Sequence, residues 1–407
     1  MKIAAILVAA VVVTAPQAPA KGPTAPRIVL GIVWQSRQTS VAKLDALALR
    51  PVSRAAPLGK AGRYLGRSPG NGVRAAFSIG EAGDAVRFVD LKSMRPEGGV
   101  GVPCSIGGAI LWEEASYLVT TCGGAASSVL VVDPVTRKLR SRRAISGSLV
   151  SVQAAGGRLV GLLAPLDKIG AARLIVVDGR GRSRIVALPG IRAGTEVLDQ
   201  ETSRARIEQP AVAVHPSGQW AVVVPASGAV VQVDLGTLAV MTHSLSVRAP
   251  AAVRKQIEGT QRSAVWTWSN TIAVSGMDAT ADGQADHWTP AGLTLIDTDT
   301  WSSRLIDPGA AGISTTGSML LSWAWMWDST TRTAVGTGLT GYDADGKQRF
   351  HLFGNEALTF ATVIGTYVYV ASDDLRQFQI VDTVTGKVVR TVRTAKPTTL
   401  APMRETF

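Results

Sequence analysis

The 407-residue sequence has few of the residues that build transition-metal or thiol chemistry. It contains two cysteines and four histidines, and no two histidines lie near each other along the chain. Zinc and copper sites in proteins usually group such residues at short spacings. The scarcity disfavours zinc and copper enzymes. The sequence also lacks the Gly-x-Ser-x-Gly motif, which is typical of α/β hydrolases.

Long apolar runs are missing from most of the chain. Runs such as Val129–Val132 are strand-sized, whereas a helix needs about 20 apolar residues to span a bilayer. The exception is Ile3–Val13, which follows Lys2 and precedes Ala18-Pro19-Ala20, a typical cleavage pattern. We expect a signal peptide over residues 1–20 and a secreted or periplasmic, envelope-associated protein with no transmembrane segment after cleavage. An uncleaved anchor is the alternative.

The net charge of +12 arises from 42 basic and 30 acidic residues. Such a charge attracts polyanions at long range, but the basic residues are scattered. The densest group is Arg140, Arg142 and Arg143, for which we expect an outer strand where arginine protects the sheet edge. We therefore expect no nucleic-acid partner.

A repeated pattern organises the rest of the chain. An apolar stretch ends in Asp and is followed by a tight turn and another strand. One unit is clear: strands over 210–214, 220–224, 230–234 and 239–245 are separated by turns rich in Gly, Pro and Ser. The aspartates are spaced by 39 to 63 residues and are predicted to accept hydrogen bonds from turn amides. They are Asp45, Asp90, Asp133, Asp178, Asp234, Asp297, Asp343 and Asp382.

A period of about 40 to 45 residues with four strands per unit is typical of a β-propeller. The segment from His215 to Trp220 and the segment from Ile380 to Val389 resemble the YVTN family of propeller repeats, within the quinoprotein-like and WD-like propellers. The resemblance implies an all-β ring of four-stranded blades. It implies nothing about function, because propellers serve many functions.

We predict a single propeller domain over residues 21–407. Seven complete units run from about Gly62 to Val392, and strands between Arg27 and Arg54 form three strands of an eighth blade. The tail near Thr398–Met403 is predicted to complete that blade, so that the N- and C-terminal strands close the ring. Seven blades with the first strands as an accessory is the alternative. We expect a monomer.

The two cysteines are predicted to form a structural disulfide. Cys104 begins one strand and Cys122 ends the next, with a turn midway between them. In an antiparallel pair this spacing brings the two residues together. In an oxidising compartment the bond would close a loop of about 17 residues and contribute about 3 kcal/mol.

The long insertions are all predicted to lie on one face of the ring. Two join the second and third strands of a blade, Pro165–Ala171 and Met277–Pro290, and two join successive blades, Gly190–Gln209 and Ser246–Arg262. Short helices are expected within residues 197–207 and 251–257. Loops on a rigid scaffold often carry the binding function. Padding without a function is the alternative.

One insertion has the spacing of a calcium loop. Oxygen-bearing side chains occur at Asp278, Thr280, Asp282 and Asp286, and Gln284 contributes a main-chain carbonyl. The pattern resembles the calcium loops of integrin-type propellers, from which Thr280 departs by replacing an acid. The sequence predicts Ca²⁺ as the one cofactor. The alternative is a polar turn that needs no metal.

Seven of the ten tryptophans lie between residues 266 and 327. Large aromatic side chains suit packing between blades. The alternative is a platform for a sugar or other ligand near His287 and Trp288.

The sequence favours a binding module whose loop-rich face engages a protein or glycan. The alternative is an extracytoplasmic enzyme, a hydrolase, lyase or quinone-type dehydrogenase, with its site at the central channel. Residues 382–387 are similar to a quinoprotein repeat, but the tryptophan and the adjacent cysteines of that family are missing. No catalytic residue is assigned.

Overall fold

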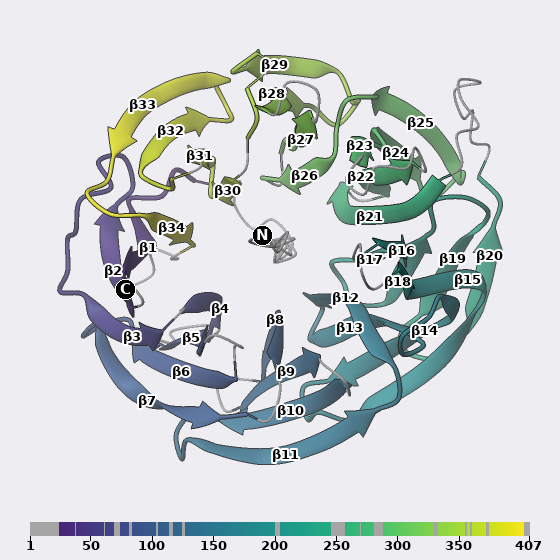
Figure 1. Ribbon diagram of the computed structural model, residues 1–407, viewed down its shortest axis with the longest axis horizontal. Coiled ribbons are helices and arrows are strands. Elements are labelled where there is room, and N and C mark those ends of the chain that lie inside the picture. Colours follow the sequence, from purple (N-terminus) through teal and green to yellow (C-terminus); the bar gives the residue numbers. More distant parts are fainter. Residues whose placement is uncertain are drawn as a thin grey trace.

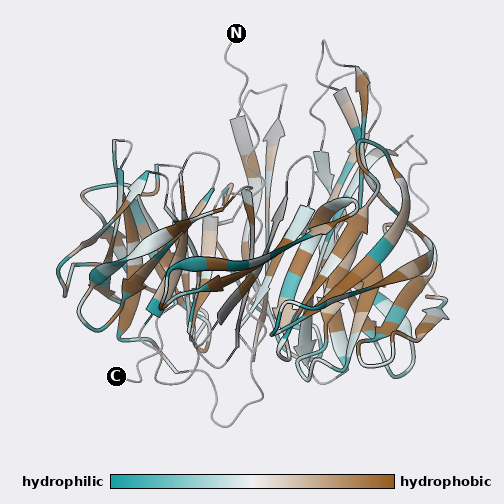
Figure 2. Ribbon diagram, turned by 90° about the horizontal axis from the view of Figure 1, so that it is seen from below, coloured by the Kyte–Doolittle hydropathy of each residue, from teal (hydrophilic) through white to brown (hydrophobic). Residues whose placement is uncertain are grey.

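The computed structural model describes residues 24–36, 38–60, 62–68, 74–80, 84–102, 105–113, 117–123, 127–199, 204–245, 257–268, 270–280, 288–316, 318–328, 333–354, 356–358, 360–371 and 374–402. These residues form a closed ring of β-sheets around a central axis (Figure 1). Seen from the side, the ring is a thick disc, and strands rise beyond one of its faces (Figure 2). No helix in the described part is long and apolar enough to cross a membrane.

Among the described residues, six sheets have four strands each. From the axis outward, the first three are β34 (Thr398–Ala401), β1 (Ile28–Gln35), β2 (Gln38–Asp45) and β3 (Ala56–Lys60); β4 (Arg63–Arg67), β5 (Arg74–Ile79), β6 (Ala85–Asp90) and β7 (Arg95–Gly101); and β8 (Ser105–Glu113), β9 (Tyr117–Gly123), β10 (Ser127–Asp133) and β11 (Lys138–Ile145).

The other three four-stranded sheets follow the same plan. They are β17 (Ala211–Val214), β18 (Trp220–Val224), β19 (Val230–Asp234) and β20 (Val240–His243); β26 (Gly312–Thr315), β27 (Leu320–Asp328), β28 (Thr333–Tyr342) and β29 (Gln348–Leu352); and β30 (Phe360–Ile364), β31 (Tyr367–Ala371), β32 (Gln377–Asp382) and β33 (Lys387–Arg393).

The remaining strands form one ten-stranded sheet. In pairing order it contains β12 (Ser148–Ala155), β13 (Arg158–Ala164), β14 (Gly170–Asp178), β15 (Ser183–Asp199), β16 (Arg204–Gln209), β21 (Ile257–Trp268), β22 (Thr271–Thr280), β24 (Leu293–Asp297) and β25 (Ser302–Asp307), with β23 (Trp288–Pro290) paired to β22.

The prediction of eight four-stranded blades is wrong. The described residues form six four-stranded blades and one ten-stranded sheet, because residues 190–199 and 204–209 are strand rather than loop and pair with neighbouring strands. The alternative of seven blades with accessory first strands is also wrong, since β1–β3 form a regular blade with β34. The all-β propeller architecture itself is confirmed.

Ring closure by the two ends of the chain is also confirmed. β1 pairs with β34 in antiparallel register, from Leu30 opposite Ala401 to Val33 opposite Thr398. Leu400 and Ala401 are buried. The strand therefore covers the inner edge of β1, which would otherwise expose unpaired backbone groups.

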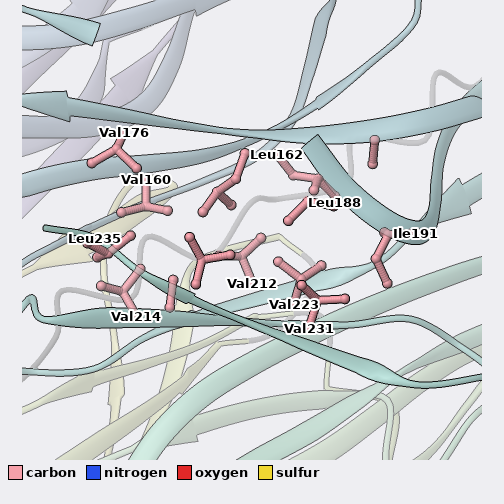
Figure 3. Packing of buried hydrophobic residues seen from close by; sticks show 14 of the residues in the cluster. Val160, Leu162, Val176, Leu188, Ile191, Val212, Val214, Val223, Val231 and Leu235 are labelled. Carbon is pink, nitrogen blue, oxygen red and sulfur yellow. The ribbon is translucent and has the colours of Figure 1, made fainter. Parts of the chain in front are cut away.

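The hydrophobic core is divided among the interfaces between neighbouring sheets. In one of them, Val160, Leu162 and Val176 from β13 and β14 face Val212 and Val223 from β17 and β18 (Figure 3). Successive side chains of a strand point to opposite faces of the sheet, and these strands are apolar at consecutive positions. Each strand therefore presents apolar side chains to the sheets on both sides. Burial between sheets, rather than one central core, stabilises the ring.

The repeated aspartates are turn residues, as predicted. Asp133 Oδ1 accepts hydrogen bonds from the amides of Val135 and Thr136, at 2.8 and 2.9 Å. Asp234 and Asp297 accept equivalent bonds from the amides of the residues two and three positions after each of them. The N–H of Thr136 holds the pKa of Asp133 well below its ordinary value, so its carboxylate stays ionised.

Guanidinium groups also join neighbouring blades. Arg184, on outer strand β15, donates to the carbonyls of Leu235 and Gly236 in the β19–β20 turn, at 2.6 and 2.7 Å. Arg304, on outer strand β25, donates in the same way to the carbonyl of Asp345 in the β28–β29 turn. In both cases the outer strand of one blade is held by the turn of the next.

Ring closure can be tested by removing β34. A chain ending at Lys396 should unfold at a lower urea concentration, with a loss of at least ~2 kcal/mol, since truncating one buried Leu alone costs about 2–5 kcal/mol. Unfolding would be followed by tryptophan fluorescence. A chain ending at Met403, which retains β34, is the control, and equal midpoints for the two chains would show that β34 does not close the ring.

Candidate interaction face

The ten-stranded sheet builds a raised structure on the face that carries the insertions. β15 is 17 residues long. Its first part pairs with β14 inside the blade, and Gly194–Asp199 leaves the blade and pairs with β16. β16 then pairs in parallel with the start of β21, from Ile207 opposite Gly259 to Gln209 opposite Gln261. We call Gly194–Asp199, β16, Ile257–Gln261, Met277–Thr280 and β23 the raised sheet.

The predicted helix within residues 197–207 is wrong. The described part of this segment is the end of β15 and the start of β16, which form an antiparallel hairpin. Tertiary pairing with β21 accounts for the strand, because the added ladder satisfies backbone groups that a short surface helix leaves open at its ends. Residues 251–256 lie outside the described residues.

Gly194 allows the chain to leave the blade. Its φ of +135° is one that L side chains rarely adopt, and a Cβ there would lie 2.2 Å from the carbonyl oxygen of Lys168. The backbone of β15 therefore passes directly against the β13–β14 loop. Only glycine permits so close an approach.

Three inner strands beneath the raised sheet are joined by one side chain. Gln153, on β12, donates from Nε2 to the carbonyl of Ala264 on β21 at 3.0 Å, and its Oε1 accepts from the amide of Val214 on β17 at 3.1 Å. The raised sheet joins the blade of β12 to the blade of β21, and the blade of β17 lies between them. The Gln153 amide group is hydrogen-bonded to both of the other blades. It gives the raised sheet a rigid base.

Charged side chains line the raised sheet in pairs. Glu208 on β16 lies 3.7 Å from Arg192 Nε and 3.3 Å from Arg206 Nη2. At its base, Asp278 lies 2.7 Å from Arg262 Nη2, and both side chains are largely buried. Arg262 also donates to the carbonyls of Gln261 and Met277, so the Arg262–Asp278 pair binds β21 to β22.

Apolar side chains project from the same region. Val197 and Leu198, at the end of β15, are 57% and 46% exposed, and Leu166 in the β13–β14 loop is also exposed. Trp325 on β27 is the one exposed tryptophan among those whose side chains are described. Exposed apolar groups gathered on one face are typical of interaction surfaces.

A cavity of about 570 Å³ lies beside the bend in β15. It is lined by residues 171–173 and 187–192 and is open to solvent. Small apolar side chains and two arginines, Arg173 and Arg192, make up its walls. Its position next to the base of the raised sheet makes it part of the same face.

The predicted calcium loop is described only in part. Asp278 and Thr280 end β22, whereas Asp282, Gln284 and Asp286 lie outside the described residues. The described residues contain no cluster of three or more metal-ligating side chains. The carboxylate of Asp278 is paired with Arg262, and calcium binding by this loop stays a prediction.

His287 lies outside the described residues, and Trp288 begins β23. The Trp288 ring lies against Gly259, where a Cβ would come within 3.1 Å of Cη2. Trp266 packs edge-on against Trp220 and His215, and Trp301 stacks on His243 with ring centroids 3.6 Å apart. Trp220, Trp266 and Trp301 therefore take part in packing within and between blades. The ligand platform near His287 and Trp288 stays a prediction.

Cys104 lies outside the described residues, so the disulfide stays a prediction. Cys122 is on β9, where the backbone register places Ile106 opposite it. β8 ends at Glu113 and β9 begins at Tyr117; residues 114–116, where the turn is predicted, lie outside the described residues.

No protein-family model matches this sequence, and no curated protein matches it. Solved structures with a similar fold exist. Dihydro-heme d1 dehydrogenase NirN in complex with DHE has a TM-score of 0.58 at 11% identity, covering 95% of this chain and 78% of that one. Citrobacter koseri AztD has a TM-score of 0.54 at 11% identity, covering 91% and 95%. At such low identity these similarities show the propeller fold alone.

Gly194 offers a direct test of the raised sheet. Gly194→Ala should weaken its pairing by about 1–3 kcal/mol, because the new Cβ collides with Lys168 and the φ value is strained. Hydrogen–deuterium exchange should then speed up in residues 204–209 and 257–261 and stay unchanged in β31 and β32.

Gly101→Ala is the matched control, since a Cβ at Gly101 meets no atom within 4 Å. Equal exchange in the two variants would show that the raised sheet does not depend on the close approach at Gly194.

Proposed function

We propose that the protein is an extracytoplasmic binding module that engages a protein partner through the raised sheet. The observation that carries this proposal is the exposure of Val197 and Leu198 at the end of a hairpin held by two blades. Large exposed aliphatic side chains are unfavourable in water, and a complementary apolar pocket on a partner would bury them.

The surroundings of this apolar pair support a protein partner. Arg192, Arg206 and Glu208 form partly exposed ion pairs on the neighbouring part of the raised sheet. An apolar centre with a polar rim is the usual arrangement of a protein–protein interface. The exposed side chains of the hairpin itself, Val197 and Leu198, are aliphatic, whereas a glycan partner would favour aromatic rings there.

Pre-organisation is the second support. The raised sheet is attached at β14 and at β21 through backbone ladders, and Gln153 joins the strands beneath it. A surface held in this way loses little conformational entropy on binding.

Val197 and Leu198 can be tested together. The double variant Val197→Asp, Leu198→Asp should lose at least tenfold in affinity for a partner isolated with the wild-type protein from the extracytoplasmic fraction, because each charge would have to be desolvated in the interface. Affinity would be measured by biolayer interferometry.

The control variant is Val135→Asp, Val384→Asp. These valines are 63% and 71% exposed but lie on β10–β11 and β32–β33 turns, at the opposite face. Retained affinity in the double variant, or equal loss in the control, would contradict the proposal.

Export rests on the N-terminal sequence. If residues 1–20 are a signal peptide, protein recovered from outside the cytoplasm should begin at Lys21, which intact mass spectrometry would show. Recovery of the uncleaved chain in the membrane fraction would indicate an anchor instead.

A further inference from the structure

The most basic part of the described surface lies away from the raised sheet, on the outer edge of the ring. β11 is the outermost strand of its blade, as expected for Arg140, Arg142 and Arg143. Lys138, Arg140, Arg142 and Arg143 are all exposed there. Five steps of about 3.4 Å separate Lys138 from Arg143, so these charges extend over roughly 17 Å.

Side chains from two turns widen this strip. On one side, the aliphatic part of Arg137 lies against Gly98 of β7, where a Cβ would approach its Cδ to 3.0 Å. On the other side, Gly181 in the β14–β15 turn lies against Val131 of β10. Its neighbours Arg180 and Arg182 are exposed. We call Arg137, Lys138, Arg140, Arg142, Arg143, Arg180 and Arg182 the basic band.

Arg143 faces the turn that carries Arg180 and Arg182. It lies opposite Val129 in the β10–β11 register, and Val129 and Val131 point to the same side of the sheet because side chains alternate. That side is the one Gly181 contacts. The basic band is therefore continuous across the boundary between two blades.

The carboxylates nearest to the basic band are already engaged. Asp133 is buried and takes hydrogen bonds from turn amides and from Arg140. Asp178 accepts from the amides of Arg180 and Arg182 and pairs with the Arg182 guanidinium at 2.7 Å. Of the seven cationic groups in the basic band, Arg140 and Arg182 pair with these two carboxylates, which leaves an excess of positive charge.

The basic residues of β11 also differ from Arg184 and Arg304. Arg140 pairs with Asp133 in its own blade, and Arg142 donates to Ser128 Oγ at 3.2 Å. Arg184 and Arg304 are held by carbonyls of the next blade. Arg184 and Arg304 each lie opposite the residue two positions before the turn aspartate of their blade. On β11 that position is occupied by Ser141, opposite Val131. The side chains of Lys138 and Arg143 make no ion pair or hydrogen bond with any residue that the structure describes, so their full charge is available to a ligand.

We propose that the basic band binds an extended acidic polysaccharide along β11. Guanidinium groups bind carboxylate and sulfate groups in bidentate geometry. Arg142 and Arg143 project to opposite sides of β11, because neighbouring side chains on a strand alternate. Both flank the exposed outer edge of the blade, which a linear chain can follow. Ser141 between the arginines and Ala144 after them are small. β11 has no aromatic ring to stack on nucleic-acid bases. Its large apolar side chains, Leu139 and Ile145, pack into the clusters between blades and are not presented to a bilayer.

The test uses the purified protein with dextran sulfate as the probe and uncharged dextran as the blank. Lys138→Gln, Arg142→Gln, Arg143→Gln should weaken binding of dextran sulfate about tenfold or more at 0.1 M salt. The wild-type affinity should fall steeply as salt rises. Circular dichroism would check that each variant is folded.

A triple variant of β33, Lys387→Gln, Arg390→Gln, Arg393→Gln, is the matched control. It removes the same number of charges from the exposed outer strand of another blade, and it should change the affinity less than threefold. Equal losses in both triple variants would show attraction by net charge alone and would overturn the proposal. So would the absence of wild-type binding to dextran sulfate.

Two further probes separate the classes of ligand. Vesicles of phosphatidylglycerol and a single-stranded DNA oligonucleotide should bind more weakly than dextran sulfate at equal salt. Tighter binding of either probe, with the same dependence on the β11 residues, would identify a membrane or nucleic-acid surface and overturn the polysaccharide assignment.

Discussion

Burial of both faces of every sheet is the constraint on which this structure depends. On β10, Leu130 and Val132 pack toward the preceding blade, and Val129 and Val131 pack toward the following one. A strand that is apolar on both sides needs a neighbour on both sides. An open row of such sheets would leave two apolar faces in water, whereas a closed ring leaves none. Pairing of β1 with β34 completes that ring.

Because the ring is closed, one of its faces can carry an elaborate structure without loss of the core. The raised sheet adds pairing between β15, β16 and β21 while the blade between them keeps its own four strands. Close approach at Gly194 and the Gln153 hydrogen bonds attach this addition to the blades below. The addition exposes Val197 and Leu198, so the residues of the proposed binding surface are separate from those that form the core.

The charged groups are also distributed unevenly over the ring. The repeated aspartates accept hydrogen bonds from turn amides, as at Asp133 and Asp234. Arg184 and Arg304, on outer strands, donate to carbonyls of the next blade. On β11, Lys138 and Arg143 make no ion pair with a described residue, and this strand lies apart from the raised sheet. The molecule therefore presents two chemically different surfaces, an apolar one on the raised sheet and a cationic one at the edge.

The sequence by itself determined the repeat, the turn role of the aspartates and the ring closure by the terminal strands, because these depend on local patterns: alternating apolar residues, Asp-led turns and a missing strand with a matching tail. It also located the face with the insertions. Sequence reasoning failed at residues 197–207, where mixed charge with apolar spacing resembles a short helix. Only the tertiary structure decided that this segment is strand, since its partners on β21 lie some fifty residues away and no local pattern encodes that pairing.

The same reason explains why eight separate blades were expected and six four-stranded blades with one ten-stranded sheet were found. It also explains the basic band, whose members from β11 and from the β14–β15 turn meet only because Gly181 packs on Val131. Local patterns determine which strands form. Contacts between residues distant in the chain decide which strands join and which surfaces they create.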